Sequence, residues 1–361
     1  MNLDFWRDKR ILLTGHTGFK GSWLSLWLQA LGCRVTGFAL PPDTNPSLYA
    51  LAGIAQGMTS IIGDIRDADA IHRALQASQP ELVIHMAAQP LVRYGYHNPV
   101  ETYATNVMGT VHLLEAVRQV QGIRGVLVIT SDKCYDNPEQ QQHFVEDDRL
   151  GGKDPYSSSK ACTELVVDAY RASYFPENRY QQHGLALATA RAGNVIGGGD
   201  WSPDRLVPDT LAAFSRHEAV TLRYPEATRP WQHVLEPLHG YLLLMEKLHD
   251  DGPAASGAWN FGPDDTHART VVDVVEKIAM LWPEPAAWRT DLAPTLHEAR
   301  YLGLNHQKAR EQLGWIPQLG WDETLEWVVD WHQQWMKHPS DIRKFSCQQI
   351  QSYQEKKASD E

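Results

Sequence analysis

Short apolar segments alternate with longer, helix-like segments through the first half of this chain. The apolar segments span residues 10–14, 34–38, 60–63, 82–86, 126–130 and 185–189. The intervening sequence favours helices over 21–31, 67–77, 99–118 and 155–174, with Asp67 as a capping residue and Pro155 in a first turn. Continuous apolar strands alternating with helices are typical of a parallel sheet covered on both faces. The sequence therefore predicts an α/β protein with a doubly wound parallel sheet.

The regular alternation of apolar and helix-like segments ends after Arg191. A loop over 197–203 is rich in glycine, and the segments beyond it are short and interrupted by prolines. We expect residues 1–191 to hold the sheet and residues 192–340 to form a smaller mixed lobe, from which some segments can return to the sheet. A helix over roughly 323–335 and a polar tail over 341–361 are expected at the end of the chain.

The composition limits the classes of function. Of the 361 residues, 43% are hydrophobic and 21% are charged, which is typical of a globular protein. A formal net charge of −11 and the lack of a basic run argue against nucleic-acid binding. No segment is apolar enough to span a membrane, and the first residues do not resemble a signal peptide. Four scattered cysteines are expected to be reduced thiols in the cytoplasm, and 16 histidines without ligand spacing predict no metal site.

A glycine-punctuated turn follows the first predicted strand. Gly15, Gly18 and Gly21 open the next helix with the spacing Gly-x-x-Gly-x-x-Gly. In a strand–turn–helix unit, such glycines let a dinucleotide pyrophosphate approach the helix N-terminus. A plain tight turn is the alternative interpretation. The context favours the cofactor, and hence a Rossmann-like sheet.

The second predicted strand bears on the choice of dinucleotide. An acidic residue commonly ends this strand and binds the adenosine ribose, but the segment 35–40 contains none, and Asp43 comes later. No arginine lies there for a 2′-phosphate, so we favour NAD over NADP. Asp64, just after the third strand, is expected either to reach the adenine or simply to cap a turn.

Tyr156 and Lys160 lie one helical turn apart, after the fifth predicted strand. An ammonium beside a phenol favours phenolate, so the pair predicts a lowered tyrosine pKa and a base for a sugar hydroxyl. Such pairs also occur by chance on protein surfaces. Here Ser131, Asp132 and Lys133 end the same strand, at the edge of the sheet where ligands bind in parallel sheets, which favours a functional role.

Together these motifs resemble the extended short-chain dehydrogenase/reductase superfamily. Within it, residues 14–24, 131–137 and 229–234 are similar to the CDP-glucose 4,6-dehydratases. The resemblance implies a Rossmann-like sheet with a smaller, mixed C-terminal substrate lobe, and NAD as cofactor. The cofactor-binding residues that it implies are Gly15, Thr17, Gly18, Phe19, Lys20, Gly21, Asp64, Ile65, Ala87, Ala88, Gln89, Asn106, Tyr156 and Lys160.

The strand-five motif departs from that of related dTDP-glucose dehydratases, which have Thr-Asp-Glu. There the aspartic acid protonates the leaving hydroxyl and the glutamate takes the C5 proton. Asp132 matches the acid, but Lys133 replaces the glutamate. Lys133 is expected to act as the C5 base, to stabilise an enolate, or to be a surface residue. The catalytic set is thus Ser131, Asp132, Lys133, Tyr156 and Lys160.

Residues that match nucleotide-sugar contacts in the relatives lie in the second lobe. They are Asn194, Arg205, Leu206, Arg229, Asn260 and Arg300. Guanidinium groups suit diphosphates because they donate paired hydrogen bonds.

The resemblance implies a redox-neutral hydro-lyase of deoxysugar biosynthesis. CDP-glucose, or a related nucleotide sugar, would be oxidised at C4, lose water across C5–C6 and regain hydride at C6, giving a CDP-4-keto-6-deoxyglucose. The resemblance also implies a homodimer through the helices over 99–118 and 155–174. A sugar-nucleotide 4-epimerase and a non-catalytic NAD-sensing protein on the same fold are the alternatives.

Overall fold

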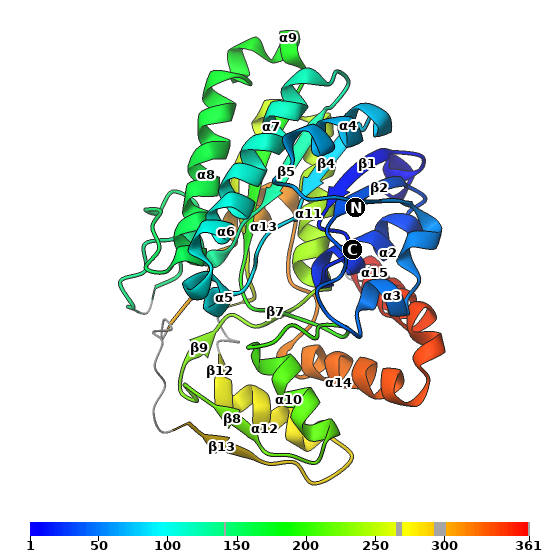
Figure 1. The fold of residues 1–361 in the computed structure, drawn as a ribbon, viewed down its shortest axis with the longest axis vertical. Coiled ribbons are helices and arrows are strands. Elements are labelled where there is room, and N and C mark those ends of the chain that lie inside the picture. Colours follow the sequence, from blue (N-terminus) through cyan, green and yellow to red (C-terminus); the bar gives the residue numbers. More distant parts are fainter. Residues whose placement is uncertain (141, 265–268, 292–300, 360–361) are drawn as a thin grey trace.

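A seven-stranded parallel sheet forms the centre of the protein in this computed structural model, which describes residues 1–140, 142–264, 269–291 and 301–359 (Figure 1). The strand order is β11-β6-β5-β4-β1-β2-β3. The strands are β1 (Arg10–Thr14), β2 (Arg34–Ala39), β3 (Thr59–Ile62), β4 (Leu82–His85), β5 (Gly125–Ile129), β6 (Ala186–Ala192) and β11 (Gly257–Phe261). The six predicted strands and the doubly wound fold are confirmed. The chain reverses its direction of winding between β3 and β4, so β1 and β4 flank the switch point at which such sheets bind ligands.

The strands alternate their side chains between two cores. Ile11 and Leu13 of β1 lie in one core and Leu12 lies in the other. The first core is covered by α2 (Phe19–Ala30), α11 (Leu235–Asp250) and α15 (Ile342–Ser359), and the second by α4 (Ala68–Ser78), α7 (Gly109–Gln119) and α8 (Pro155–Ser173). Burial on both faces explains why the strands are continuously apolar in the sequence.

The helix starts predicted at Asp67 and Pro155 agree with the structure, whereas the helix expected from residue 21 begins at Phe19. Asp67 caps α4 by accepting a hydrogen bond from the backbone N–H of Ala70 at 2.9 Å. Asp154 caps α8 in the same way, and Pro155 occupies its first turn. The single helix expected over 99–118 is divided by a π-helical segment, Ala104–Met108, between α6 (Pro99–Tyr103) and α7.

The second lobe packs around its own apolar core. That core joins α10 (Leu206–Ser215), β8 (Val220–Leu222), α12 (Val271–Leu281), β13 (Trp288–Thr290) and α14 (Trp321–Lys337), in the lower part of Figure 1. Short strand pairs connect it to the sheet domain: β7 (Val195–Ile196) with β10 (Gln232–His233), and β9 (Thr228–Arg229) with β12 (Arg269–Thr270). The remaining helices are α1 (Leu3–Trp6), α3 (Leu48–Leu51), α5 (Val92–His97), α9 (Tyr180–His183) and α13 (Gln307–Leu313).

The expected polar tail is instead the long helix α15, which lies against α2 in Figure 1. Ile342, Ile350 and Tyr353 are almost fully buried in the core shared with α2. Arg343 fixes the start of the helix by donating to the backbone carbonyl of Ala52 at 2.9 Å. The tail was predicted wrongly because only a thin apolar stripe marks the helix, and the segment around α2 and Ala52 that it contacts lies some 300 positions earlier. No helix within the described ranges is long and apolar enough to cross a membrane.

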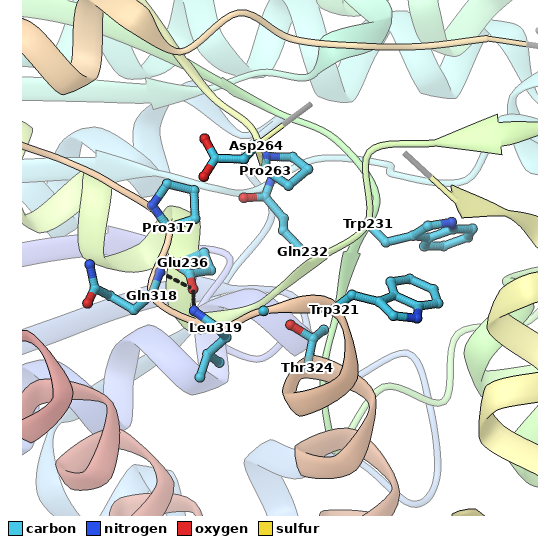
Figure 2. A pocket seen from close by; sticks show the side chains of 11 residues that line it. Trp231, Gln232, Glu236, Pro263, Asp264, Pro317, Gln318, Leu319, Trp321 and Thr324 are labelled. Carbon is cyan, nitrogen blue, oxygen red and sulfur yellow. Dashed lines mark hydrogen bonds between the residues drawn. The ribbon is translucent and has the colours of Figure 1, made fainter. Parts of the chain in front are cut away.

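A buried carboxylate ties this C-terminal region to the sheet domain. Glu236, at the start of α11, accepts hydrogen bonds through Oε1 from the backbone N–H groups of Gln318 and Leu319 at 2.8 and 2.6 Å (Figure 2). Its Oε2 accepts from the hydroxyl of Tyr353 at 2.6 Å. Figure 2 shows Glu236, Gln318 and Leu319 beside a small cavity of about 80 Å³ that Trp231 and Trp321 also line. Glu236 therefore fixes the segment before α14 and the helix α15 at one point.

Candidate active site

A cavity of about 710 Å³ lies at the carboxyl ends of β1, β4, β5 and β6 and extends to the second lobe. It brings together most of the residues that the sequence predicts for the site. Those that line it are Gly15, Thr17, Gly18, Phe19, Lys20, Gly21, Asp64, Ile65, Ala87, Ala88, Gln89, Ser131, Asp132, Lys133, Tyr156, Lys160, Asn194, Arg205, Leu206 and Arg229. The cavity therefore joins a dinucleotide-type turn to a cluster of proton-transfer groups.

The glycine turn has a shape that only glycine permits. Gly15 has a φ of 76°, and a Cβ atom there would lie 2.7 Å from the backbone nitrogen of Ala87. A Cβ atom at Gly21 would overlap the carbonyl oxygen of Gly15. Gly18 is the N-cap of α2 and lines the cavity, so the first N–H groups of this helix face it. The turn thus fits a dinucleotide pyrophosphate at a helix N-terminus.

The far end of the cavity lacks the acidic residue that commonly ends β2. Leu40, Asp43, Asp64 and Ile65 line this end. Asp64 pairs with Arg66, with 2.6 Å between Oδ2 and Nη2, and it also accepts the backbone N–H of Arg66. The hydrogen bonds from Arg66 lower the pKa of Asp64. Asp64 therefore both stabilises a turn and lines the cavity. The structure is compatible with either role expected from the sequence, a contact to the adenine or the capping of a turn.

Asp132 lies in a short 3-10 turn directly after β5. Ser131 starts this turn: its Oγ accepts the backbone N–H of Lys133 at 3.2 Å and donates to Oδ1 of Asp132 at 2.9 Å. Oδ2 of Asp132 is buried and makes no hydrogen bond to the residues that the structure describes. Asp132 lines the cavity, so its carboxyl group, with one oxygen unsatisfied among the described residues, is a candidate to exchange a proton with a ligand.

Tyr156 and Lys160 are both buried in the first turns of α8. Lys160 donates from Nζ to the carbonyl oxygen of Ile129 at 3.1 Å, and burial lowers its pKa to about 8. The expected lowering of the Tyr156 pKa is wrong for this structure, because burial raises that pKa to about 12. The Ser131 hydroxyl and Arg205 oppose this rise, whereas Asp132 adds to it. Desolvation therefore outweighs the charge of Arg205 in setting the pKa of Tyr156.

A buried ion pair holds the catalytic helix against the sheet. Glu164, one turn after Lys160 on α8, accepts two hydrogen bonds from the Arg191 guanidinium, at 3.0 and 2.8 Å. It also accepts hydroxyl hydrogen bonds from Thr130, at the end of β5, and Thr189, on β6. The charge of Glu164 raises the pKa of Lys160, against the effect of burial. No local pattern in the sequence indicates this pair, because its partners come from separate strands.

The second lobe contributes several cations to the cavity. Arg205, just before α10, pairs with Asp200, with 3.0 Å between Nη1 and Oδ2. Arg93, on α5, and Arg223, after β8, both pair with Asp204, at 3.0 and 3.2 Å. Arg93 and Arg223 also line the cavity, although the sequence did not single them out. The cluster of Arg93, Asp204 and Arg223 therefore connects the sheet domain to the second lobe beside the cavity.

Two predicted site residues are buried in supporting roles and do not line the cavity. Asn260 accepts a hydrogen bond from the Tyr135 hydroxyl at 2.8 Å and donates to the Phe144 carbonyl at 2.9 Å, so its side chain is used inside the fold. Asn106 accepts the backbone N–H of Gln89 and donates to its carbonyl, at 2.8 and 3.1 Å, and thereby shapes the loop that lines the cavity. Arg300 lies outside the described residues.

The fold and this cavity define a Rossmann-type enzyme of the extended short-chain dehydrogenase/reductase class. Residues 12–328 match the family described as GDP-mannose 4,6 dehydratase, and the chain belongs to this family. It is 52% identical to a CDP-glucose 4,6-dehydratase from Salmonella typhimurium, over 92% of this chain and 93% of that protein.

Solved structures share the fold. A UDP-glucose 4-epimerase from Thermus thermophilus in complex with NAD superimposes with a TM-score of 0.76 at 24% identity, covering 90% of this chain and 99% of that one. The protein MoeE5 in complex with UDP-glucose and NAD gives a TM-score of 0.76 at 25% identity, with the same coverage of both chains. The fold therefore occurs in proteins that bind NAD and nucleotide sugars.

Proposed function

We propose that this protein is an NAD-dependent dehydratase that converts CDP-glucose into CDP-4-keto-6-deoxyglucose. The observation that carries the proposal is the convergence of Tyr156, Asp132 and Lys133 on the cavity that contains the glycine turn. The 52% identity to the Salmonella typhimurium CDP-glucose 4,6-dehydratase supports the choice of nucleotide and sugar.

The residues present fit an NAD cofactor. Gly15, Gly18 and the first turn of α2 would hold the pyrophosphate, and the loop 87–89 would form the wall opposite this turn. When bound, this cofactor supplies a hydride acceptor for C4 of the sugar and a hydride donor for C6. Tyr156 and Lys160 line the same cavity, so the redox end of the cofactor must lie near them for oxidation at C4.

The side chains divide the proton transfers. Tyr156 takes the proton of the 4-hydroxyl group, and Lys160, one turn later on α8, is proposed to favour the phenolate when the ligands are bound. Burial raises the pKa of Tyr156 to about 12 in the unliganded site, so its proposed role as a base requires that bound cofactor or substrate favour the phenolate. The resulting ketone makes the C5 proton acidic, and Lys133 is the base proposed to accept it.

Asp132 completes the dehydration by protonating the departing 6-hydroxyl group. Its buried Oδ2 accepts no hydrogen bond from the residues that the structure describes, so this atom is the one proposed to carry the proton. A 4-epimerase needs no acid at this point, since it removes and returns hydride at C4 alone. Asp132 therefore favours dehydration over epimerisation. Arg205 and Arg229, which line the cavity, are the proposed ligands of the substrate diphosphate.

The direct experiment is incubation of the purified protein and NAD with four nucleotide sugars: CDP-glucose, dTDP-glucose, UDP-glucose and GDP-mannose. Product mass should fall by one water with CDP-glucose. An unchanged mass with a new sugar stereochemistry would support an epimerase instead. The absence of any reaction with all four substrates would contradict the proposal.

The assembly and setting of the protein are further parts of this proposal. We propose a cytoplasmic homodimer that acts in deoxysugar biosynthesis, such as that of the lipopolysaccharide O-antigen. Exposed apolar side chains on the α6–α8 surface support the dimer: Val100, Met108 and Leu165 are 83%, 46% and 57% exposed. Four free cysteines are consistent with a reducing compartment.

A further inference from the structure

Gln232 is a buried residue of β10 whose side chain joins the ends of two strands of the central sheet. It is 3% exposed, and its amide nitrogen donates hydrogen bonds to the backbone carbonyl groups of Gly193 at 3.1 Å and of Phe261 at 2.9 Å. Gly193 directly follows β6, and Phe261 ends the neighbouring strand β11. A single amide group therefore holds both strands where they leave the sheet.

The oxygen of the same amide group is left without a partner. The two carbonyl acceptors require the nitrogen on their side, so Oε1 points away from them. It is buried and accepts no hydrogen bond from the residues that the structure describes, although Gln232 also lines the small cavity in Figure 2. A buried, unpaired oxygen is costly to a fold. The two carbonyl groups that the nitrogen holds are thus the contacts that account for a glutamine at this position.

Gly193 in turn supports the carboxyl group of Asp132. A Cβ atom built on Gly193 would overlap Oδ2 of Asp132, so this oxygen lies directly against the glycine backbone. The other oxygen, Oδ1, accepts the Ser131 hydroxyl at 2.9 Å. Two contacts therefore locate the carboxyl group, one within its own turn and one to the end of β6.

The contact to Gly193 depends on the turn that follows β6. Asn194, the next residue, has a φ of 42°, in the left-handed region that residues other than glycine rarely adopt. Gln232 holds this turn twice: its side chain binds the Gly193 carbonyl, and its backbone N–H donates to the Asn194 carbonyl at 3.3 Å. A strained turn persists only where the surrounding contacts maintain it.

We propose that Gln232 is a positioning residue, which holds the Gly193 backbone in place and thereby sets the location of the Asp132 carboxyl group. The inference rests on the proposed function, in which Asp132 protonates the departing 6-hydroxyl group. As that C–O bond breaks, its electron pair leaves with the oxygen, and the proton from Asp132 completes a water molecule. The transfer needs both groups at hydrogen-bond distance, and a displacement of about 1 Å can slow a reaction by about 10²-fold.

The test compares oxidation with water loss in a single turnover with NAD and CDP-glucose. Gln232→Met removes both side-chain hydrogen bonds and keeps the length of the side chain. NADH should form at the wild-type rate and persist, whereas water loss, followed by product mass, should slow on the order of tenfold. The backbone bond to Asn194 survives this substitution, so the affinity for CDP-glucose should stay unchanged.

A second variant and a matched control complete the experiment. Gln232→Glu keeps the shape of the side chain but cannot donate to two carbonyl groups in either ionisation state. It should give the same selective loss, and it serves if Gln232→Met does not fold. Gln349 is also buried, donates through Nε2 to the Trp327 carbonyl at 3.0 Å, and has a buried Oε1 without a partner among the described residues. Gln349→Met removes the same kind of bond between α14 and α15 and should leave both steps at wild-type rates.

Two results would overturn the inference. Equal rates of water loss in Gln232→Met and Gln349→Met would show that the Gly193 carbonyl needs no such anchor. A parallel fall in the rates of oxidation and water loss would give Gln232 a purely structural role. Normal dehydration by Asp132→Asn would instead refute the proposed function, so the two failures are distinguishable.

Discussion

The buried Oδ2 atom of Asp132 lies so close to Gly193 that a Cβ atom at position 193 would overlap it. Gly193 follows the end of β6, and Asp132 follows the end of β5, so two neighbouring strands determine the place of this carboxyl group. The proposed acid therefore depends on a glycine that carries no functional group of its own.

Substitution of this glycine should disable water loss without disabling oxidation. In Gly193→Ala the added methyl group displaces the Asp132 carboxyl, and dehydration of CDP-glucose should slow by about 10²-fold or more. NADH should still form at the start of the reaction, as measured by its absorbance. Gly320→Ala is the matched control, because no described atom lies within 4 Å of a Cβ atom there. Equal dehydration rates in both variants would exclude a role for the Asp132 position.

Removal of the Lys133 amino group should separate oxidation at C4 from proton loss at C5. In Lys133→Met, reduced cofactor should accumulate while exchange of the C5 hydrogen with deuterated water falls by about 10²-fold. Mass spectrometry of recovered nucleotide sugar measures this exchange. Normal exchange in the variant would move the C5 base to another residue of the cavity.

The stability of the protein should depend on the ionisation of Glu236. Burial raises the pKa of this carboxyl group from 4.5 to about 7, against the three hydrogen bonds that favour its charged form. Since the folded state holds the proton more tightly, this contribution is complete below pH 4.5 and is lost as the pH rises to about 7. The free energy of unfolding of the wild type should therefore fall by up to about 3 kcal/mol relative to Glu236→Gln across that interval.

Urea denaturation at several pH values between 4.5 and 8 measures this dependence. Glutamine keeps an acceptor for Gln318 and Leu319, the bonds drawn in Figure 2, but it does not titrate. Glu218→Gln, at an exposed ion pair with Arg216, is the control and should leave the pH profile unchanged. Parallel profiles for the wild type and Glu236→Gln would rule out this linkage.

The proposed dimer makes a prediction about the surface of α8. Leu165→Glu introduces a charge at an apolar side chain that is 57% exposed in the single chain, so it should convert dimers into monomers at micromolar concentration. Sedimentation velocity distinguishes the two species. Met280→Glu, at an even more exposed apolar residue of α12, should remain dimeric. A wild-type protein that is already monomeric would refute the proposed assembly.

The sheet was predictable because burial on both faces leaves a direct trace in the sequence. Each of the strands β1, β4 and β5 contains at least three consecutive apolar residues, and local capping residues such as Asp67 mark where helices begin. The glycine turn was also predictable from the sequence, since Gly15 and Gly21 have backbone contacts that exclude a side chain.

Other features depend on contacts between distant segments and could not be read from local pattern. Asn260 lies in a motif like those of substrate ligands, yet Tyr135 and Phe144, more than a hundred positions away, bind its side chain inside the fold. The pKa of Tyr156 also depends on contacts between distant segments of the chain. The spacing to Lys160 predicted a lowered pKa, whereas the burial that raises it depends on how the folded chain covers the site.

The central claim is that Tyr156 removes the first proton and Asp132 delivers the one that completes water loss. A single turnover of Asp132→Asn with NAD and CDP-glucose tests it most directly, with NADH absorbance and product mass followed together. The account predicts that NADH forms and persists while dehydration slows by about 10²–10⁴-fold, and that Tyr156→Phe forms no NADH at all. Wild-type dehydration by Asp132→Asn, or substrate binding by that variant without any NADH, would contradict the account.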